Sequence, residues 1–150
     1  MIQNLLIGAA GAFGGTVGLS LLLNAPARSI LPASVTGMLG QLVYMILHQY
    51  MGQGLMFSYF FATVVISAIC EIFARVMRMP STIFLLSALI PLVPGYSFYA
   101  MLLALVQDNG MQAARYGMQA VQIVAAIAVG SAVTPVLFRT MMRRSAKRSI

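Results

Sequence analysis

Long apolar runs recur along the whole chain, with few charged residues between them. A run of about 20 apolar residues is long enough to cross the hydrocarbon core of a bilayer as a helix. Five such segments are predicted, at residues 2–23, 35–51, 55–74, 81–106 and 116–138. The pattern therefore predicts an all-α integral membrane protein, with five transmembrane helices in a single domain over residues 1–150.

The fourth segment is interrupted at its centre by the sequence PLVPG at residues 91–95. Pro91 and Pro94 each lack an N–H group and clash with the carbonyl four residues back, those of Ser87 and Ile90. Backbone groups freed in hydrocarbon need partners, so broken helices persist mainly where they face protein or a wet cavity. A helix broken near mid-membrane is a recurrent sign of a transport site. A packing kink is the alternative, but two prolines with Gly95 favour the transport site.

The basic residues predict an orientation for the five spans. Lys and Arg gather on the cytoplasmic side of membrane proteins. With five crossings, eight of the nine Lys and Arg residues fall on one side, and only Arg115 falls on the other. The N-terminus is therefore predicted outside and the basic tail, residues 139–150, in the cytoplasm. This tail either anchors the topology, which is favoured, or binds anionic lipid.

Composition narrows the function classes. Hydrophobic residues make up 61% of the chain and charged residues 7%, whereas soluble domains carry about 25% charged residues. One histidine and two acids offer little for acid–base catalysis, and no nucleotide-binding or hydrolase motif is present. The sequence thus predicts no enzyme activity, no cofactor and no metal site. The basic residues lie at segment ends without interleaved aromatics, so nucleic-acid binding is not expected.

Polar residues inside the predicted spans form narrow stripes on three of the helices. They are typical either of hydrogen bonds between helices or of a polar pathway that these helices share, and both interpretations stay open. The candidate pathway residues are Gln41, Tyr44, Ser67, Gln119 and Gln122.

Glu71 is the only acid inside a predicted span, which makes it a candidate for proton coupling. Arg75 follows four residues later in the favourable order for a helical ion pair. A structural pair between the two is therefore the favoured interpretation. His48 lies near the outer end of the second span, where an interfacial histidine is favoured over a titrating site.

Glycines are spaced four residues apart in the first span. Gly11 with Gly15, and Gly14 with Gly18, form small-xxx-small pairs that allow close backbone contact between membrane helices. The spacing predicts tight packing of this helix against another one, without indicating which.

Three stretches together resemble the threonine/serine exporter (ThrE) family. They are GMLGQLVY at residues 37–44, CEIFARVMRMPSTIF at residues 70–84, and IPLVPG at residues 90–95. The chain is similar to the small, YjjB-like membrane subunit of that family over nearly its whole length. It departs from the family pattern at Gln41, where an aromatic is common, and at Tyr96, where a second glycine often follows Pro-Gly.

The resemblance implies an exporter of small polar metabolites in the bacterial cytoplasmic (inner) membrane. Family members are linked to threonine and serine, and some two-subunit members to succinate. A half of this kind is expected to work with a YjjP-like larger subunit, or else to self-associate. A scaffold subunit without transport of its own and a passive pore are the rival interpretations.

The broken fourth segment suggests how such a substrate binds. Freed carbonyls would accept the ammonium group, and N–H groups at the start of the outer half-helix would receive the carboxylate. No Lys or Arg lies near mid-membrane, which favours a zwitterionic amino acid over a dicarboxylate. The predicted substrate-binding residues are Ser87, Ile90, Pro91, Pro94, Gly95, Tyr96, Ser97 and Tyr99.

Overall fold

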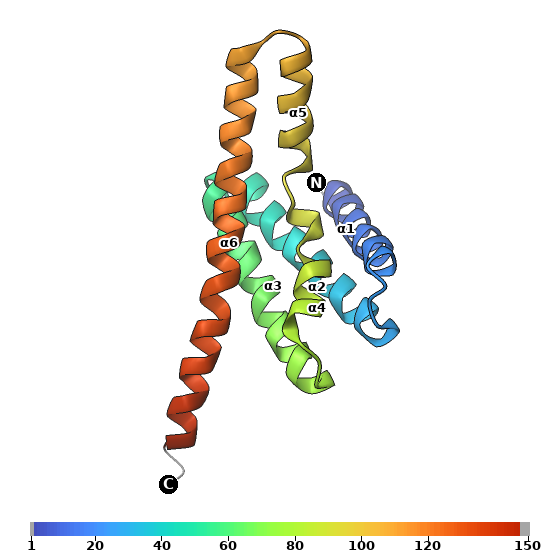
Figure 1. Ribbon diagram of the computed structural model, residues 1–150, viewed down its shortest axis with the longest axis vertical. Coiled ribbons are helices and arrows are strands. Elements are labelled where there is room, and N and C mark those ends of the chain that lie inside the picture. The colour runs from blue at the N-terminus through green and yellow to red at the C-terminus, as the bar shows by residue number, and fades with distance from the viewer. Residues whose placement is uncertain (1, 148–150) are drawn as a thin grey trace.

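The structure is a computed structural model that describes the backbone of residues 2–147 and the side chains of residues 3–136 and 140. Within this range the chain is helical, without strands (Figure 1). The elements in chain order are α1 (Ile2–Leu22), α2 (Ala27–Met45), the π-helical turn η1 (Ile46–Tyr50), α3 (Leu55–Met77), α4 (Ser81–Ala88), the 3₁₀ turn η2 (Ile90–Leu92), α5 (Gly95–Val106) and α6 (Gly110–Lys147).

The all-helical membrane class is confirmed. Four helices are long and apolar enough to cross a membrane, and a fifth span results if the bent pair in the fourth segment is one span. That pair, Ser81–Leu92 and Gly95–Val106, bends by 51° at the expected position. The chain is therefore a multi-pass membrane protein whose fourth apolar segment is broken between α4 and α5.

Two helices begin earlier than the apolar pattern predicts. α2 starts at Ala27 rather than at residue 35, with Pro32 inside it. Pro32 withholds a hydrogen bond only from the carbonyl of Arg28, in the first turn, so the helix tolerates it. α6 starts at Gly110 rather than at residue 116, because the Asn109 side chain accepts a hydrogen bond from the N–H of Gln112 at 3.2 Å.

The structure describes the basic tail predicted at residues 139–150 mainly by its backbone. Its backbone continues α6 as far as Lys147. Residues 148–150 lie outside the described residues, and so do the tail side chains other than that of Thr140.

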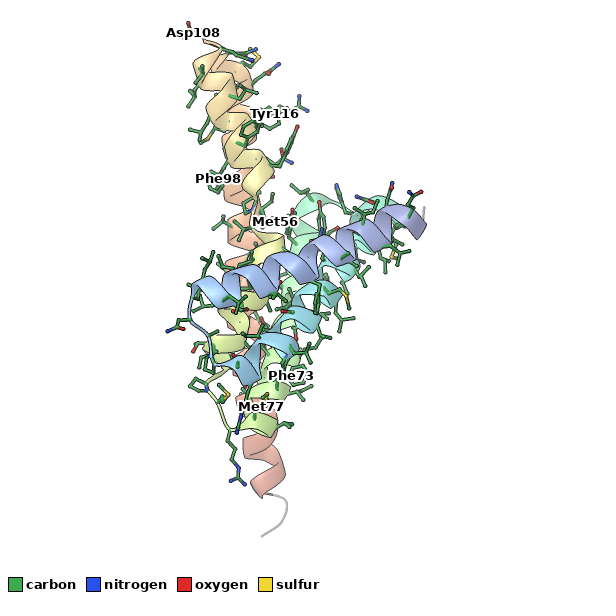
Figure 2. The ribbon with its side chains drawn as sticks, turned by 90° about the vertical axis from the view of Figure 1, so that its right-hand side faces the viewer. Met56, Phe73, Met77, Phe98, Asp108 and Tyr116 are labelled. Carbon is green, nitrogen blue, oxygen red and sulfur yellow. The ribbon has the colours of Figure 1, made fainter. Side chains whose placement is uncertain are left out.

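The helices form a bundle with a projecting arm. α2 packs on α1, α3 and α4, and α6 packs on α3 and α5. In Figure 1, α5 and the first part of α6 extend side by side beyond the bundle of α1–α4. The perpendicular view places Phe98, Tyr116 and Asp108 along this arm, whereas Phe73 and Met77 lie toward the opposite end of the molecule (Figure 2).

Close helix contacts are made at glycines other than the predicted ones. A Cβ atom added at Gly37 would lie 2.6 Å from Thr16 Oγ1 and 3.1 Å from the carbonyl oxygen of Ala88. At Gly40 an added Cβ would collide with the side chain of Ile66, and at Gly130 it would lie 3.0 Å from the carbonyl oxygen of Phe60. These glycines let α2 approach α1, α3 and α4, and let α6 approach α3.

The tight packing predicted for the glycine pairs of α1 is wrong within this chain. A Cβ atom added at Gly11, Gly14, Gly15 or Gly18 would meet no heavy atom within 4 Å. α1 instead buries a neighbouring face, which carries Ala9, Ala12, Thr16 and Ser20. The spacing of these glycines thus places them on one side of the helix, but it does not show whether another helix packs against that side.

Candidate functional site

A cavity of about 210 Å³ lies where α1 and α2 meet the break in the fourth segment. Three segments that are distant in sequence form its walls, and α1 and α2 both pack against η2 there. The lining residues are Gly8, Gly11, Ala12 and Gly15 of α1, Gln41 of α2, and Ile90 and Pro91 of η2.

The glycines of α1 account for this space. Gly11 and Gly15 face the cavity, and a Cβ atom at either position would enter open space rather than a neighbouring helix. Gly8 differs, because a Cβ there would lie 2.6 Å from the sulfur of Met45. Side chains at Gly11 and Gly15 would therefore occupy the cavity without displacing other parts of the chain.

Gln41 is the one polar side chain among the described lining residues. Its Oε1 atom is buried and has no hydrogen-bond partner in the described part of the chain. A buried polar atom without a partner carries a desolvation cost of about 1–3 kcal/mol, and such atoms are rare in native structures. The side chain lines the cavity, and its amide carries both acceptor and donor groups.

The break itself is held by short local hydrogen bonds. The N–H of Leu92 donates to the carbonyl of Leu89, and that of Val93 to the carbonyl of Ile90, both at 3.0 Å. The N–H of Gly95 donates to the carbonyl of Val93 at 2.7 Å. The Ile90 carbonyl, which the sequence predicted to be freed by Pro94, is thus paired within the 3₁₀ turn.

A second cavity, of about 300 Å³, borders the same break. Its lining is wholly apolar and comes from α4, the break, α5 and α6. The lining residues are Leu86, Leu89, Ile90, Val93, Pro94, Phe98, Val124 and Ile127. Ile90 borders both cavities, so the broken segment lies between the Gln41 cavity and this apolar cavity at that residue.

A family model described as "Threonine/Serine exporter, ThrE" matches residues 8–137, which is most of the chain. The chain belongs to the threonine/serine exporter (ThrE) family. Comparison with curated proteins and with solved structures gave no match. The match covers α1 through the apolar part of α6, so both cavities of this ThrE-family chain lie inside it.

The predicted substrate-binding residues of the ThrE-family chain fall into three groups. Ile90 and Pro91 line the Gln41 cavity. Pro94 borders the apolar cavity, and Ser87 and Ser97 are buried, Ser97 on the same face of α5 as the buried Ala100 and Ala104. The remaining residues, Gly95, Tyr96 and Tyr99, are exposed at the start of the arm, where the Tyr96 ring meets that of Tyr116 edge-on at 6.3 Å.

Of the candidate pathway residues, only Gln41 lines the first cavity. The Tyr44 ring lies 4.3 Å from that of Tyr59 and 5.5 Å from that of His48. The His48 ring nitrogen Nδ1 lies 3.1 Å from the carbonyl oxygen of Gln53, at the loop end of α2. Tyr44 therefore belongs to an aromatic cluster between α2 and α3.

The other three pathway candidates lie elsewhere. Ser67 is buried on α3, and its hydroxyl has no partner among the described residues. Gln119 is half-buried and Gln122 is exposed on α6, which packs on α3 and α5. The structure thus does not bring the five candidates together in one place.

Glu71 and Arg75 lie at the end of α3 that is distant from the Tyr44 cluster. The Glu71 carboxylate and the Arg75 guanidinium approach to 3.6 Å across one helical turn. The Glu71 side chain is 16% exposed. An ion pair is thus formed there, and a role of Glu71 in proton coupling stays a prediction.

Sequence reasoning identified Gln41 and the break, but it missed the α1 wall of the cavity. The sequence did contain a signal for this wall, namely the glycines at positions 8, 11 and 15. Their spacing indicated helix packing, and only the position of η2 across α1 shows that Gly11 and Gly15 leave a space instead.

Proposed function

We propose that this ThrE-family chain is a subunit of a secondary exporter for threonine, serine or a similar small zwitterion, and that the substrate binds in the Gln41 cavity. The observation that carries the proposal is that Gln41, whose buried Oε1 has no partner among the described residues, lines a cavity bordered by a broken helix. Intramembrane irregular backbone is tolerated where it lines such a space. The family assignment supplies the transport role.

The size and charge of the cavity suit an amino acid. Its volume of about 210 Å³ is below the roughly 300–1,000 Å³ of pockets for drug-sized ligands. The described lining carries no charged residue, so a dicarboxylate would depend on cations from another subunit. In this proposal Gln41 Oε1 accepts a hydrogen bond from the substrate's ammonium or hydroxyl group.

The same proposal includes a partner subunit in the bacterial cytoplasmic membrane. Gly14 and Gly18 are exposed on α1 and have open space beside them. The close helix contact that their spacing allows is therefore available to another subunit. The YjjP-like larger subunit is the proposed partner, and a second copy of this chain is the alternative.

Counterflow of labelled threonine and serine into proteoliposomes tests the binding site, with any co-purifying subunit included. Gln41→Leu removes the hydrogen bond and should raise KM about tenfold or more, because a hydrogen bond to a charged group contributes about 1.5–3 kcal/mol. Gly15→Leu should have a similar effect by filling the cavity. Ala10→Leu is the matched control, because Ala10 is exposed on α1 and does not line the cavity.

Two results would contradict this site. Wild-type KM and maximal rate in both Gln41→Leu and Gly15→Leu would place binding elsewhere. Saturable counterflow of succinate but not of threonine or serine would support the transport role and contradict the zwitterionic substrate.

A further inference from the structure

One short segment forms the wall between two cavities of opposite character. Pro91 faces the polar Gln41 cavity, Val93 and Pro94 face the apolar cavity, and Ile90 borders both. On the polar side the turn η2 packs against α1 and α2. On the other side, Val124 and Ile127 of α6 line the apolar cavity. Leu92 anchors the segment in the hydrophobic core, and the residues on either side of it border one cavity or the other.

The backbone of this wall is bonded only to itself and its immediate neighbours. Its N–H groups at Leu92 and Val93 reach carbonyls three residues back, and Pro91 and Pro94 have no N–H to contribute. α4 ends at Ala88 before the wall and α5 begins at Gly95 after it. The segment can thus shift by rotations at its two ends, while the hydrogen bonds inside α4 and α5 stay intact.

The apolar cavity is open on one side, because Leu86, Val93 and Val124 of its lining are about half exposed or more. Its volume of about 300 Å³ is lined only by apolar side chains, which gain packing contacts from any apolar group that enters. Apolar groups are therefore the favourable occupants of this space.

We propose that the apolar cavity receives residues 90–94 when the Gln41 cavity opens, so that one cavity fills as the other enlarges. The movement carries Ile90 and Pro91 away from Gln41 and brings Val93 and Pro94 onto the side chains of α6. This inference rests on the proposed function for the identity of the transported substrate. To the proposed function it adds which segment moves, in which direction it moves, and which cavity receives it.

Filling the apolar cavity tests the movement directly. Val124→Phe and Leu86→Phe each add a large side chain to its lining, from α6 and from α4 respectively. Val121→Phe is the matched control, because Val121 lies on α6 less than one turn before Val124, is exposed and does not line the cavity. Counterflow should show the maximal rate reduced about tenfold in both filled variants, with KM within about twofold and the control unchanged.

A second readout does not depend on transport. Ala12→Cys places a thiol in the Gln41 cavity at a position that is buried in this structure, and Cys70→Ala removes the only native cysteine. Labelling of Ala12→Cys by a membrane-impermeant maleimide should slow about tenfold when Val124→Phe is added, because the wall can no longer withdraw. Adding Val121→Phe should leave the labelling rate unchanged.

The outcomes separate this inference from the proposed function. Full maximal rate and unchanged labelling in a monodisperse Val124→Phe or Leu86→Phe protein overturn the inference. This is also the result expected if a lipid chain fills the space. Unchanged transport in Gln41→Leu and Gly15→Leu overturns the proposed function instead, and the labelling rates then still decide whether the wall moves. If Val124→Phe fails to fold, Leu86→Phe decides alone, because Leu86 is 65% exposed and accepts a larger side chain at its outer edge.

Discussion

At the scale of single residues, the glycines of this chain have two opposite roles. Gly37 is buried where α2 meets α1 and α4, and an added Cβ would press on Thr16 and on the backbone of Ala88. Thr16 cannot yield easily, because it is fully buried and its hydroxyl donates to the carbonyl of Ala12 at 2.8 Å. We expect Gly37→Ala to destabilise the protein by about 1–3 kcal/mol through overpacking.

The measurement uses the single cysteine as a reporter. Cys70 is buried, so its reaction with a thiol-sensitive dye on heating follows unfolding in detergent. Gly14→Ala is the matched control: its Cβ meets open space, and Ala in a helix interior is favoured over Gly by about 0.5–1 kcal/mol. A melting temperature for Gly37→Ala equal to that of Gly14→Ala would contradict the close contact.

Gly11 and Gln41 show what a sequence reveals of such a residue and what it withholds. Spacing along one helix placed Gly11 and Gly15 on a common face, and polarity in an apolar span singled out Gln41. Neither pattern identifies the segment that lies opposite these residues in the folded chain. Whether a glycine face is a contact or a cavity wall depends on how η2 lies across α1, which is set by packing between segments about 80 residues apart in sequence.

At the scale of secondary structure, the broken fourth segment followed from proline chemistry alone, and the structure places the break between Ala88 and Gly95. The double substitution Pro91→Ala with Pro94→Ala restores two N–H donors and removes both ring clashes. We expect a more continuous helix with an unchanged or higher melting temperature and a maximal transport rate reduced at least about tenfold. Far-ultraviolet circular dichroism and counterflow measure these two effects.

Pro32→Ala is the control for this prediction, because Pro32 lies inside α2 without interrupting it and lines neither cavity. It should leave transport unchanged. Wild-type transport by the double variant, with increased helicity, would show that the break is dispensable.

The helix ends were predicted less well than the break. The early start of α6 depends on the polar contact of the Asn109 side chain, which hydropathy does not register, and α2 begins at Ala27 although Pro32 lies inside it. The π-helical turn at residues 46–50 gave no signal in the apolar pattern either. It contains His48, whose ring stacks on that of Tyr44, and the Tyr44 ring in turn contacts Tyr59 of α3.

At the scale of the whole molecule, the arm sets a geometric constraint on the membrane position. α6 has 38 residues, which is about 57 Å at 1.5 Å per residue, and a bilayer core is about 30 Å thick. α6 must therefore extend well past the hydrocarbon core at one end or both. Apolar side chains of the arm, including Tyr99, Leu102 and Val106, are more than half exposed, so lipid or another subunit must cover them.

The positions of the loops and helix ends allow the orientation of the chain in the membrane to be predicted and tested. The α1–α2 and α3–α4 connections lie toward the same end of the molecule as the last turns of α6, and the start of α1, the α2–α3 loop and the α5–α6 turn lie toward the other (Figure 1). Arg28, Arg75 and Arg78 belong to the first group, whereas Arg115 follows the α5–α6 turn. The positive-inside rule then places the first group in the cytoplasm.

We therefore expect a fluorescent protein fused after residue 150 to fold and fluoresce in the cytoplasm, and alkaline phosphatase inserted between Asp108 and Asn109 to be active outside. The insertion site is a tight turn, with Asp108 at φ 55°, where an added domain disturbs little packing. If α4 and α5 instead formed a re-entrant hairpin that returns to its own side, the C-terminus would lie outside, and the fluorescent fusion would be dark. That result would replace five crossings by four and remove the alternating charge pattern on which the orientation depends.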